Sequence, residues 1–118
     1  MAIKTIGVLG SGTMGAGIMQ VCALAGYNVV QRSRRQTSVD GGRATVEKKL
    51  AKLVAKEKLT QEDMDAAMAR ISGSTDLEIM KDADFIIEAA TEDMEAKKAL
   101  FKDLDELCKP ECIIATNT

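Results

Sequence analysis

The stretch Gly10-Ser11-Gly12-Thr13-Met14-Gly15 decides the fold, because of what stands on either side of it. Before it comes the apolar pattern of a short buried strand: Ile3, Ile6, Val8 and Leu9. Residues 14–25 then predict a helix, and Gly26 stands where a left-handed C-cap is favoured. Residues 28–32 predict a second strand. Strand, glycine turn, helix and strand within about 30 residues indicate a βαβ unit with parallel strands and a right-handed crossover.

The rest of the chain continues the alternation of helices and strands. A long helix is expected over residues 38–58, and Thr60 followed by Asp63 resembles a capping box that opens a second helix to about residue 70. Strands are expected at 71–74, 85–90 and 113–115, a helical turn at 77–80, and a helix at 94–108. We therefore expect one domain over residues 1–118: an α/β, Rossmann-type doubly wound parallel sheet in the order 3-2-1-4-5, ending after the fifth strand, with a helical hairpin after strand 2.

Helical spacing of apolar residues predicts which side of each helix faces the core. For the first helix these residues are Ile18, Val21, Cys22 and Ala25. For the long helix they are Val46, Leu50, Leu53 and Val54. For the last helix they are Leu100, Phe101, Leu104 and Leu107.

Composition excludes several classes of protein. The formal net charge of -2 and only three aromatic residues argue against a nucleic-acid partner. No apolar run approaches the roughly 20 residues that span a bilayer, and no signal peptide precedes the first strand. Three cysteines without a framework spacing indicate reduced thiols in a cytoplasmic protein. Because the chain has no histidine, we expect no metal site.

The three glycines of the opening stretch have separate tasks in a dinucleotide site. Gly10 allows the tight turn, Gly12 lets the backbone approach a pyrophosphate, and Gly15 allows the helix to pack closely on the strand. The pyrophosphate then lies at the helix N-terminus, where free N–H groups and the helix dipole favour negative charge. The intervening Ser11, Thr13 and Met14 complete this predicted loop. The alternative is a structural turn that binds nothing.

The end of the second strand indicates which dinucleotide is bound. NAD sites place an acid about 20 residues beyond the glycines to bind the ribose 2′-hydroxyl. Here Ser33 occupies that position, Arg34 and Arg35 follow, and Asp40 is too far along. A serine can hydrogen-bond a 2′-phosphate, and arginines can hold it with charge-assisted bonds. We therefore predict NADP, with NAD as the weaker alternative, over an ordinary solvated basic loop.

Four stretches together resemble the N-terminal domain of the 3-hydroxyacyl-CoA dehydrogenases, most of all the bacterial 3-hydroxybutyryl-CoA enzymes. They are Val8-Leu9-Gly10-Ser11-Gly12-Thr13-Met14-Gly15-Ala16-Gly17-Ile18, Arg70-Ile71-Ser72-Gly73-Ser74-Thr75-Asp76, Glu88-Ala89-Ala90-Thr91-Glu92-Asp93 and Ala115-Thr116-Asn117-Thr118. The resemblance covers the whole chain. It implies an oxidoreductase that exchanges hydride between a nicotinamide and a 3-hydroxyacyl-CoA in cytosolic fatty-acid or butyrate metabolism.

The resemblance also assigns roles to individual positions. It implies cofactor contacts by Ala89, Ala90, Glu92 and Lys97, with Asn117 in the loop beneath the nicotinamide. It matches the lysine-rich helix to the segment that contacts the CoA moiety, which makes candidates of Lys49, Lys52 and Lys56. The alternative for these lysines is a solvated helix face.

Two departures from the family pattern matter. The family typically uses NAD and has Asp where Ser33 stands, so the Ser33–Arg35 loop indicates a change of cofactor specificity, for which engineering is one origin. The family's catalytic serine, its His–Glu pair, a substrate-binding asparagine and its helical dimerisation domain all fall beyond Thr118. We therefore expect NADP(H) binding without turnover. The alternatives are a fragment that self-associates through its exposed edge, with weak cofactor binding, and a different reductase of the same superfamily.

Overall fold

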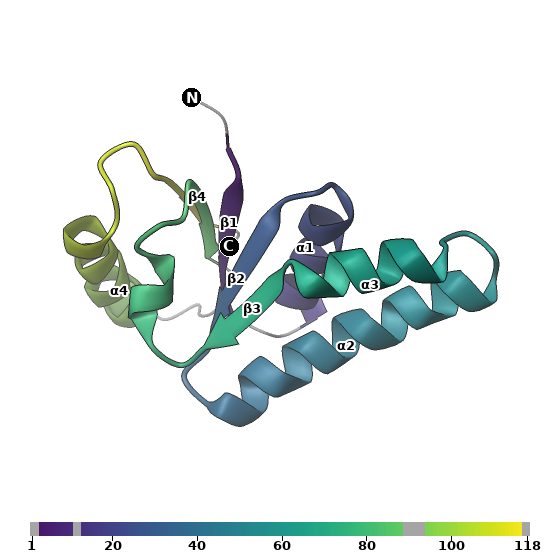
Figure 1. Cartoon of the computed structure of the whole chain (residues 1–118). Helices are drawn as coiled ribbons and strands as arrows, with labels where there is room; N and C mark the ends of the chain where they lie inside the picture. The colour runs from purple at the N-terminus through teal and green to yellow at the C-terminus, as the bar shows by residue number, and fades with distance from the viewer. Residues whose placement is uncertain (1–2, 11–12, 89–93, 117–118) are drawn as a thin grey trace.

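The computed structural model describes residues 3–10, 13–88 and 94–116. Its centre is a parallel sheet in the order β3-β2-β1-β4-β5 (Figure 1). The strands are β1 (Thr5–Leu9), β2 (Asn28–Arg32), β3 (Ile71–Ser74), β4 (Phe85–Glu88) and β5 (Ile113–Thr116). The predicted fold class and strand order are confirmed.

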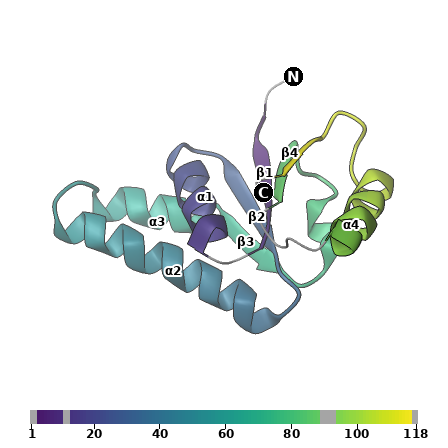
Figure 2. The same cartoon turned by 180° about the vertical axis from the view of Figure 1, so that it is seen from behind.

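Helices cover both faces of the sheet, as Figures 1 and 2 show from opposite sides. They are α1 (Thr13–Leu24), α2 (Gln36–Ala55), α3 (Gln61–Ala69), the 3₁₀ turn η1 (Leu77–Met80) and α4 (Met94–Leu107). The first three pack together on one face, and η1 and α4 pack on the other. The α2–α3 pair is the predicted helical hairpin, and it extends beyond the sheet.

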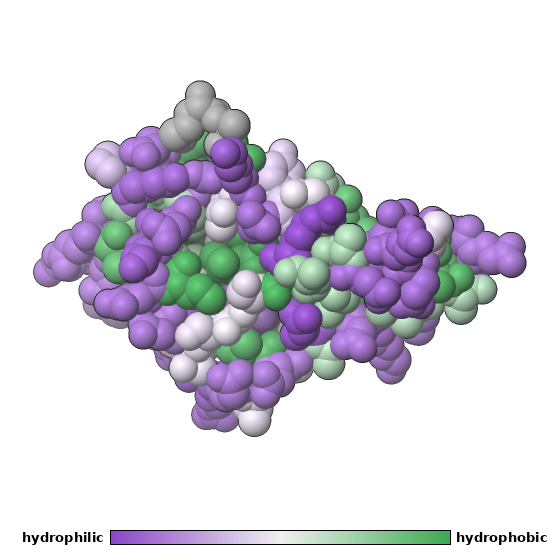
Figure 3. Space-filling model, in the orientation of Figure 1, coloured by the Kyte–Doolittle hydropathy of each residue, from purple (hydrophilic) through white to green (hydrophobic). Residues whose placement is uncertain are grey.

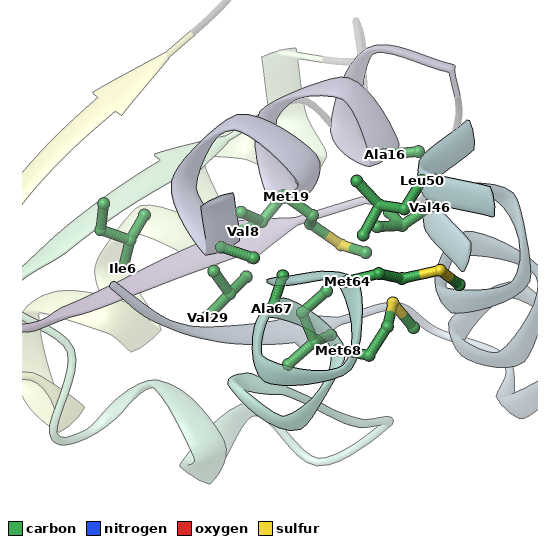
Figure 4. Close-up of a cluster of buried hydrophobic side chains, with 12 residues drawn as sticks. Ile6, Val8, Ala16, Met19, Val29, Val46, Leu50, Met64, Ala67 and Met68 are labelled. Carbon is green, nitrogen blue, oxygen red and sulfur yellow. The ribbon is translucent and has the colours of Figure 1, made fainter. Parts of the chain in front are cut away.

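The larger core cluster lies between the sheet and α1, α2 and α3 (Figure 4). Val46 and Leu50 of α2 are buried there as predicted. The predicted core face of α1 is only partly right: Ile18 and Cys22 pack against the core, but Val21 is 67% exposed and Ala25 is also exposed. The fully buried residues of α1 are Ala16, Met19 and Ala23. Two of these are alanines, whose small side chains allow α1 to pack closely.

The second cluster joins the other face of the sheet to η1 and α4. Leu104 is fully buried there, and the other predicted apolar residues of α4 pack against it at partial exposure. Gly7 of β1 is needed for this packing, because a Cβ atom at Gly7 would stand 2.4 Å from the sulfur of Met80. Met80 of η1 therefore packs directly against β1, the central strand.

The helix ends follow local capping rules. Gly26 has a φ of 101°, and the N–H groups of Gly26 and Tyr27 donate to Ala23 and Cys22 in a Schellman motif. Thr60 caps α3 by accepting a hydrogen bond from the Asp63 N–H at 3.1 Å, as predicted. The long helix starts two residues earlier than predicted and ends at Ala55, because Glu57 adopts a left-handed conformation with a φ of 60°.

Candidate functional site

Four of the five buried polar side chains in the described residues gather at the carboxyl edge of the sheet. Gln31 and Ser33 lie at the end of β2, Glu88 ends β4, and Lys97 of α4 packs over it. The end of β1, which leads into the glycine stretch, lies between β2 and β4. Ligands of open parallel α/β sheets bind outside this edge, where the strand order reverses.

The start of the glycine stretch has the geometry that only glycine accepts readily. Gly10 has a φ of 110°, and its N–H donates to the carbonyl of Arg32 at 3.0 Å, so the turn is tied to the end of β2. A Cβ atom at Gly15 would stand 2.7 Å from the Gly10 carbonyl oxygen. The first turn of α1 carries no acidic residue. An anionic pyrophosphate therefore fits at this helix N-terminus.

The segment after β2 presents two cations to solvent beside a buried hydroxyl. Ser33 is only 7% exposed and its N–H donates to the Ser74 carbonyl at 3.4 Å, whereas Arg34 and Arg35 are exposed. In the described part of the chain, neither arginine side chain makes an ion pair or a hydrogen bond. Arg35 is also the N-cap of α2, without a side-chain cap, so the positive end of the α2 dipole adds to their charge.

Lys97 and Glu88 form a buried ion pair at the same edge. The Lys97 Nζ atom lies 3.3 Å from the Glu88 Oε1 atom, and the two side chains are 8% and 0% exposed. The pair joins α4 to the end of β4, where Glu88 is in register with Leu9 of β1. Lys97 thus lies at the carboxyl edge of the sheet, and its contact with a cofactor stays a prediction. Its partner Glu88 was missed, because nothing in the sequence pairs two charges nine residues apart.

The three lysines predicted to contact CoA share one face of α2. Lys49 is half-buried, and Lys52 and Lys56 are exposed, at the spacing i, i+3 and i+7. They occupy the half of α2 that leads into the hairpin, whose surface is largely hydrophilic on the right of Figure 3. Asp40, predicted to be too far to serve the ribose, lies in α2 and accepts a hydrogen bond from Gln36 at 2.9 Å.

Several predicted site residues lie wholly or partly beyond what the structure describes. Ser11, Gly12, Ala89, Ala90, Glu92 and Asn117 lie outside the described residues. Thr13 and Met14 are the first two residues of α1, which begins directly after the undescribed pair. The structure therefore brings together Gly10, Gly15, Ser33, the two arginines and Lys97 along one edge. The cofactor-binding role of the whole predicted set stays a prediction.

The amino edge of the sheet holds a polar cluster that sequence reasoning missed. The Asp84 carboxylate accepts hydrogen bonds from the N–H groups of Lys4 at 2.8 Å and Thr5 at 2.9 Å, and forms an ion pair with Lys109. The Lys109 ammonium and the two amides hold the pKa of Asp84 well below its usual range. This cluster lies at the end of β1 and β4 remote from the glycine stretch, so we assign it to stability.

Other chemistries find little support in the described residues. No group of three or more potential ligands there is arranged to hold a metal ion. None of the described helices combines the length and the apolar composition needed to cross a bilayer. The three cysteines are half-buried free thiols, and burial raises the pKa of Cys108 to about 11, so its thiol is protonated at neutral pH.

The fold defines the class of this protein, and comparison with known proteins defines its family. The parallel sheet in the order 3-2-1-4-5, with a glycine turn after β1, is a dinucleotide-binding domain of the Rossmann type. The family model for the 3-hydroxyacyl-CoA dehydrogenase NAD-binding domain matches residues 5–118. The chain therefore belongs to the NAD-binding domain family of the 3-hydroxyacyl-CoA dehydrogenases.

Relatives and solved structures agree with this assignment. A 3-hydroxybutyryl-CoA dehydrogenase of Clostridioides difficile is 47% identical over 113 residues, which cover 96% of this chain and 40% of that protein. The crystal structure of (S)-3-hydroxybutyryl-CoA dehydrogenase from Ralstonia eutropha matches with a TM-score of 0.95 at 45% identity, over 99% of this chain and 41% of that one. A 3-hydroxybutyryl-CoA dehydrogenase structure from Escherichia coli matches with a TM-score of 0.97 at 37% identity, over 100% and 25%. The chain thus spans about two fifths of the curated relative's length.

Proposed function

We propose that this chain binds NADP(H) in preference to NAD(H), as the nucleotide-binding part of a cytoplasmic 3-hydroxyacyl-CoA dehydrogenase. The observation that carries the proposal is the end of β2, where a buried serine is followed by two exposed, unpaired arginines. An acid at position 33 would repel a 2′-phosphate, whereas Ser33 can donate a hydrogen bond to it. Arg34, Arg35 and the N-terminus of α2 supply positive charge next to it.

The other residues of the site hold the remainder of the dinucleotide. Gly10, Gly15 and the first turn of α1 take the pyrophosphate, and Lys97, fixed by Glu88, lies on the nicotinamide side. A bound nicotinamide supplies hydride transfer. The names of the relatives indicate a 3-hydroxybutyryl-CoA substrate, and Lys49, Lys52 and Lys56 are positioned along one helix face to meet the anionic CoA.

Cofactor titrations test this proposal. The fluorescence of NADPH and of NADH is titrated with the 118-residue chain and with a triple variant, S33D/R34Q/R35Q. We expect the unaltered chain to bind NADPH about 10- to 100-fold more tightly than NADH, the range of one charge-assisted hydrogen bond. The triple variant should reverse the preference. Equal affinities in the unaltered chain would refute the role given to the arginines.

We also propose that the chain binds cofactor without turning over a substrate. The chain has no histidine, the side chain that most often serves as a general acid or base near neutral pH. NADPH absorbance in the presence of acetoacetyl-CoA should stay constant within the rate of a protein-free control. An oxidation rate proportional to chain concentration would show that the chain is catalytic.

The competing candidate is a self-associating module that has little affinity for cofactor. One observation favours it: β5 is an edge strand among the described strands, and its Ile113 is 51% exposed. Exposed edges pair with other chains. Size-exclusion chromatography with and without NADPH separates the candidates, because an oligomer that is unaffected by NADPH and shows no saturable binding would support the module and oppose our proposal.

A further inference from the structure

We propose that Gln31 is a positioning residue for cofactor choice, acting through the hydroxyl of Ser33. The inference rests on the proposed preference for NADP(H) and extends it to a residue that never touches the cofactor. Gln31 belongs to β2 and is only 1% exposed. Ser33 lies two residues further on, so both side chains point to the same side of the strand.

The position of Gln31 calls for an apolar residue on packing grounds alone. It lies in a central strand with helices on both faces, and its neighbour Val29 on the same side is fully buried in the core. Strands buried on both faces are normally continuous apolar runs. A buried amide in such a place is tolerated only when its polar atoms find partners. A leucine or methionine at this position would need no polar partner, whereas the buried amide of Gln31 does.

The side chain of Gln31 lies beside β3, next to Gly73. Gln31 is in register with Gly73 of β3. A Cβ atom at Gly73 would stand 2.5 Å from the Val39 side chain of α2 and 3.6 Å from the Gln31 Oε1 atom. The missing side chain at Gly73 thus leaves the room that Val39 of α2 occupies, and the Gln31 amide oxygen lies beside it at an ordinary van der Waals distance.

The other side of the amide faces Ser33. The Gln31 Nε2 atom donates to the Ser33 Oγ atom at 3.5 Å, a long hydrogen bond between two buried side chains. Because Gln31 donates to the Ser33 oxygen, the serine proton is left for another acceptor. Beyond Ser33 the chain leaves β2 and presents the exposed Arg34 and Arg35. Gln31 therefore favours Ser33 as a donor, which suits a phosphate, because a phosphate above its second pKa has acceptor oxygens and no proton to donate.

A double-mutant cycle on cofactor preference tests this inference. Gln31→Met keeps the length of the side chain but has no N–H group, and Gln31→Asn keeps the amide but withdraws it by one methylene. The readout is the ratio of the NADH and NADPH dissociation constants, measured in the unaltered chain and in a Ser33→Ala background. We expect either Gln31 variant to reduce the preference for NADPH by about 2- to 10-fold, the range of one neutral hydrogen bond.

The Ser33→Ala background separates positioning from a general structural role. In that background, replacing Gln31 should leave the ratio unchanged, because no hydroxyl remains to be oriented. Val29→Ala, on the same strand and the same side, is the matched control: it should lower the urea midpoint but leave the ratio unchanged. A ratio unaffected by both Gln31 variants, or altered equally with and without Ser33, would overturn the inference.

The same measurements distinguish a failure of the inference from a failure of the proposed function. If the unaltered chain prefers NADPH but the Gln31 variants do too, by the same factor, the proposed function stands and the inference is wrong. If the unaltered chain does not prefer NADPH, the proposed function has failed, and the inference with it.

Discussion

Gly15 and Gly17 stand two residues apart, on opposite sides of the same helix, and their surroundings differ. A Cβ atom at Gly15 would collide with the Gly10 carbonyl oxygen, whereas one at Gly17 would meet nothing within 4 Å. We predict that Gly15→Ala forces α1 away from the turn and weakens NADPH binding by at least about 10-fold, because the backbone no longer closes on the pyrophosphate. The measurement is an NADPH titration by fluorescence.

Gly17→Ala is the matched control for that variant. Alanine in an open helical position removes the entropy cost of glycine, so the free energy of unfolding should rise by about 0.5–1 kcal/mol with NADPH affinity unchanged. Urea denaturation followed by circular dichroism measures the gain. Equal loss of binding in both variants would show that α1 tolerates no methyl group and that the contact with Gly10 is not the cause.

At the scale of elements, the Glu88–Lys97 pair fastens α4 to the end of β4. Lys97→Met leaves the Glu88 carboxylate buried without its cation. We predict a loss of about 3–5 kcal/mol of unfolding free energy, the range for breaking a buried pair from one side. The double variant Glu88→Met/Lys97→Met should recover most of that loss, because no buried charge remains. Urea midpoints of the three variants give the coupling, and a double variant as unstable as the single one would contradict a role for the pair.

The cluster of Asp84 and Lys109 fastens the start of β1 and the turn before β5 to the start of β4, at the opposite edge of the sheet. It also makes stability depend on pH. The pKa of Asp84 is lowered, chiefly by the hydrogen bond from Lys109 and then by the Lys4 and Thr5 amides. A carboxyl whose pKa is lower in the folded state stabilises fully above its unfolded value of about 3.9, and that stability is lost as the pH falls below it. The chain should therefore unfold progressively below about pH 4.

Asp84→Asn isolates this contribution. The variant should be less stable at pH 7, and its urea midpoint should fall less between pH 5 and pH 2. Because Asp84 also raises the pKa of Lys109 above its usual 10.5, the unaltered chain should in addition lose stability as the pH rises past that value. If the urea midpoints of the chain and the variant fall equally as the pH is lowered, the cluster does not cause the pH dependence.

For the whole molecule, a ligand that binds only the folded chain must raise its stability. At a free NADPH concentration of about 100 times its Kd, the free energy of unfolding should increase by about 2.7 kcal/mol. If NADH binds about 10-fold more weakly, the same concentration should add about 1.4 kcal/mol. Thermal unfolding with each cofactor at matched concentration measures the difference, and a larger shift with NADH would contradict the proposed preference.

Much of the fold could be predicted because its signals are local. The βαβ start, β2 over residues 28–32, β3 over 71–74 and the Thr60 cap all follow from spacing and turn chemistry. The buried face of α1 could be predicted only in part, because periodicity identifies apolar residues but not how closely a helix approaches a sheet. The end of α2 was also missed, since a left-handed glutamate, Glu57, carries no sequence signal.

The candidate site shows the same division. Gly10, Gly15 and the Ser33–Arg35 segment could be predicted from their distance to the strands that precede them, and their role stays a prediction. The contacts of Gln31, Glu88 and Asp84 could not be predicted, because each has a partner that the fold supplies: Asp84 binds Lys4, 80 residues away. A polar residue inside the predicted second strand was the available signal for Gln31.

The two arginines after β2 hold no partner in the described chain, while the polar contacts that secure the strands lie at the far edge. Exchanging residues 34 and 35 therefore breaks no side-chain hydrogen bond or ion pair among the described residues. If these arginines set the choice of cofactor, as we propose, that choice can change without a compensating substitution in the described part of the chain. Relatives that draw on different reductant pools of a cell would then keep the same architecture.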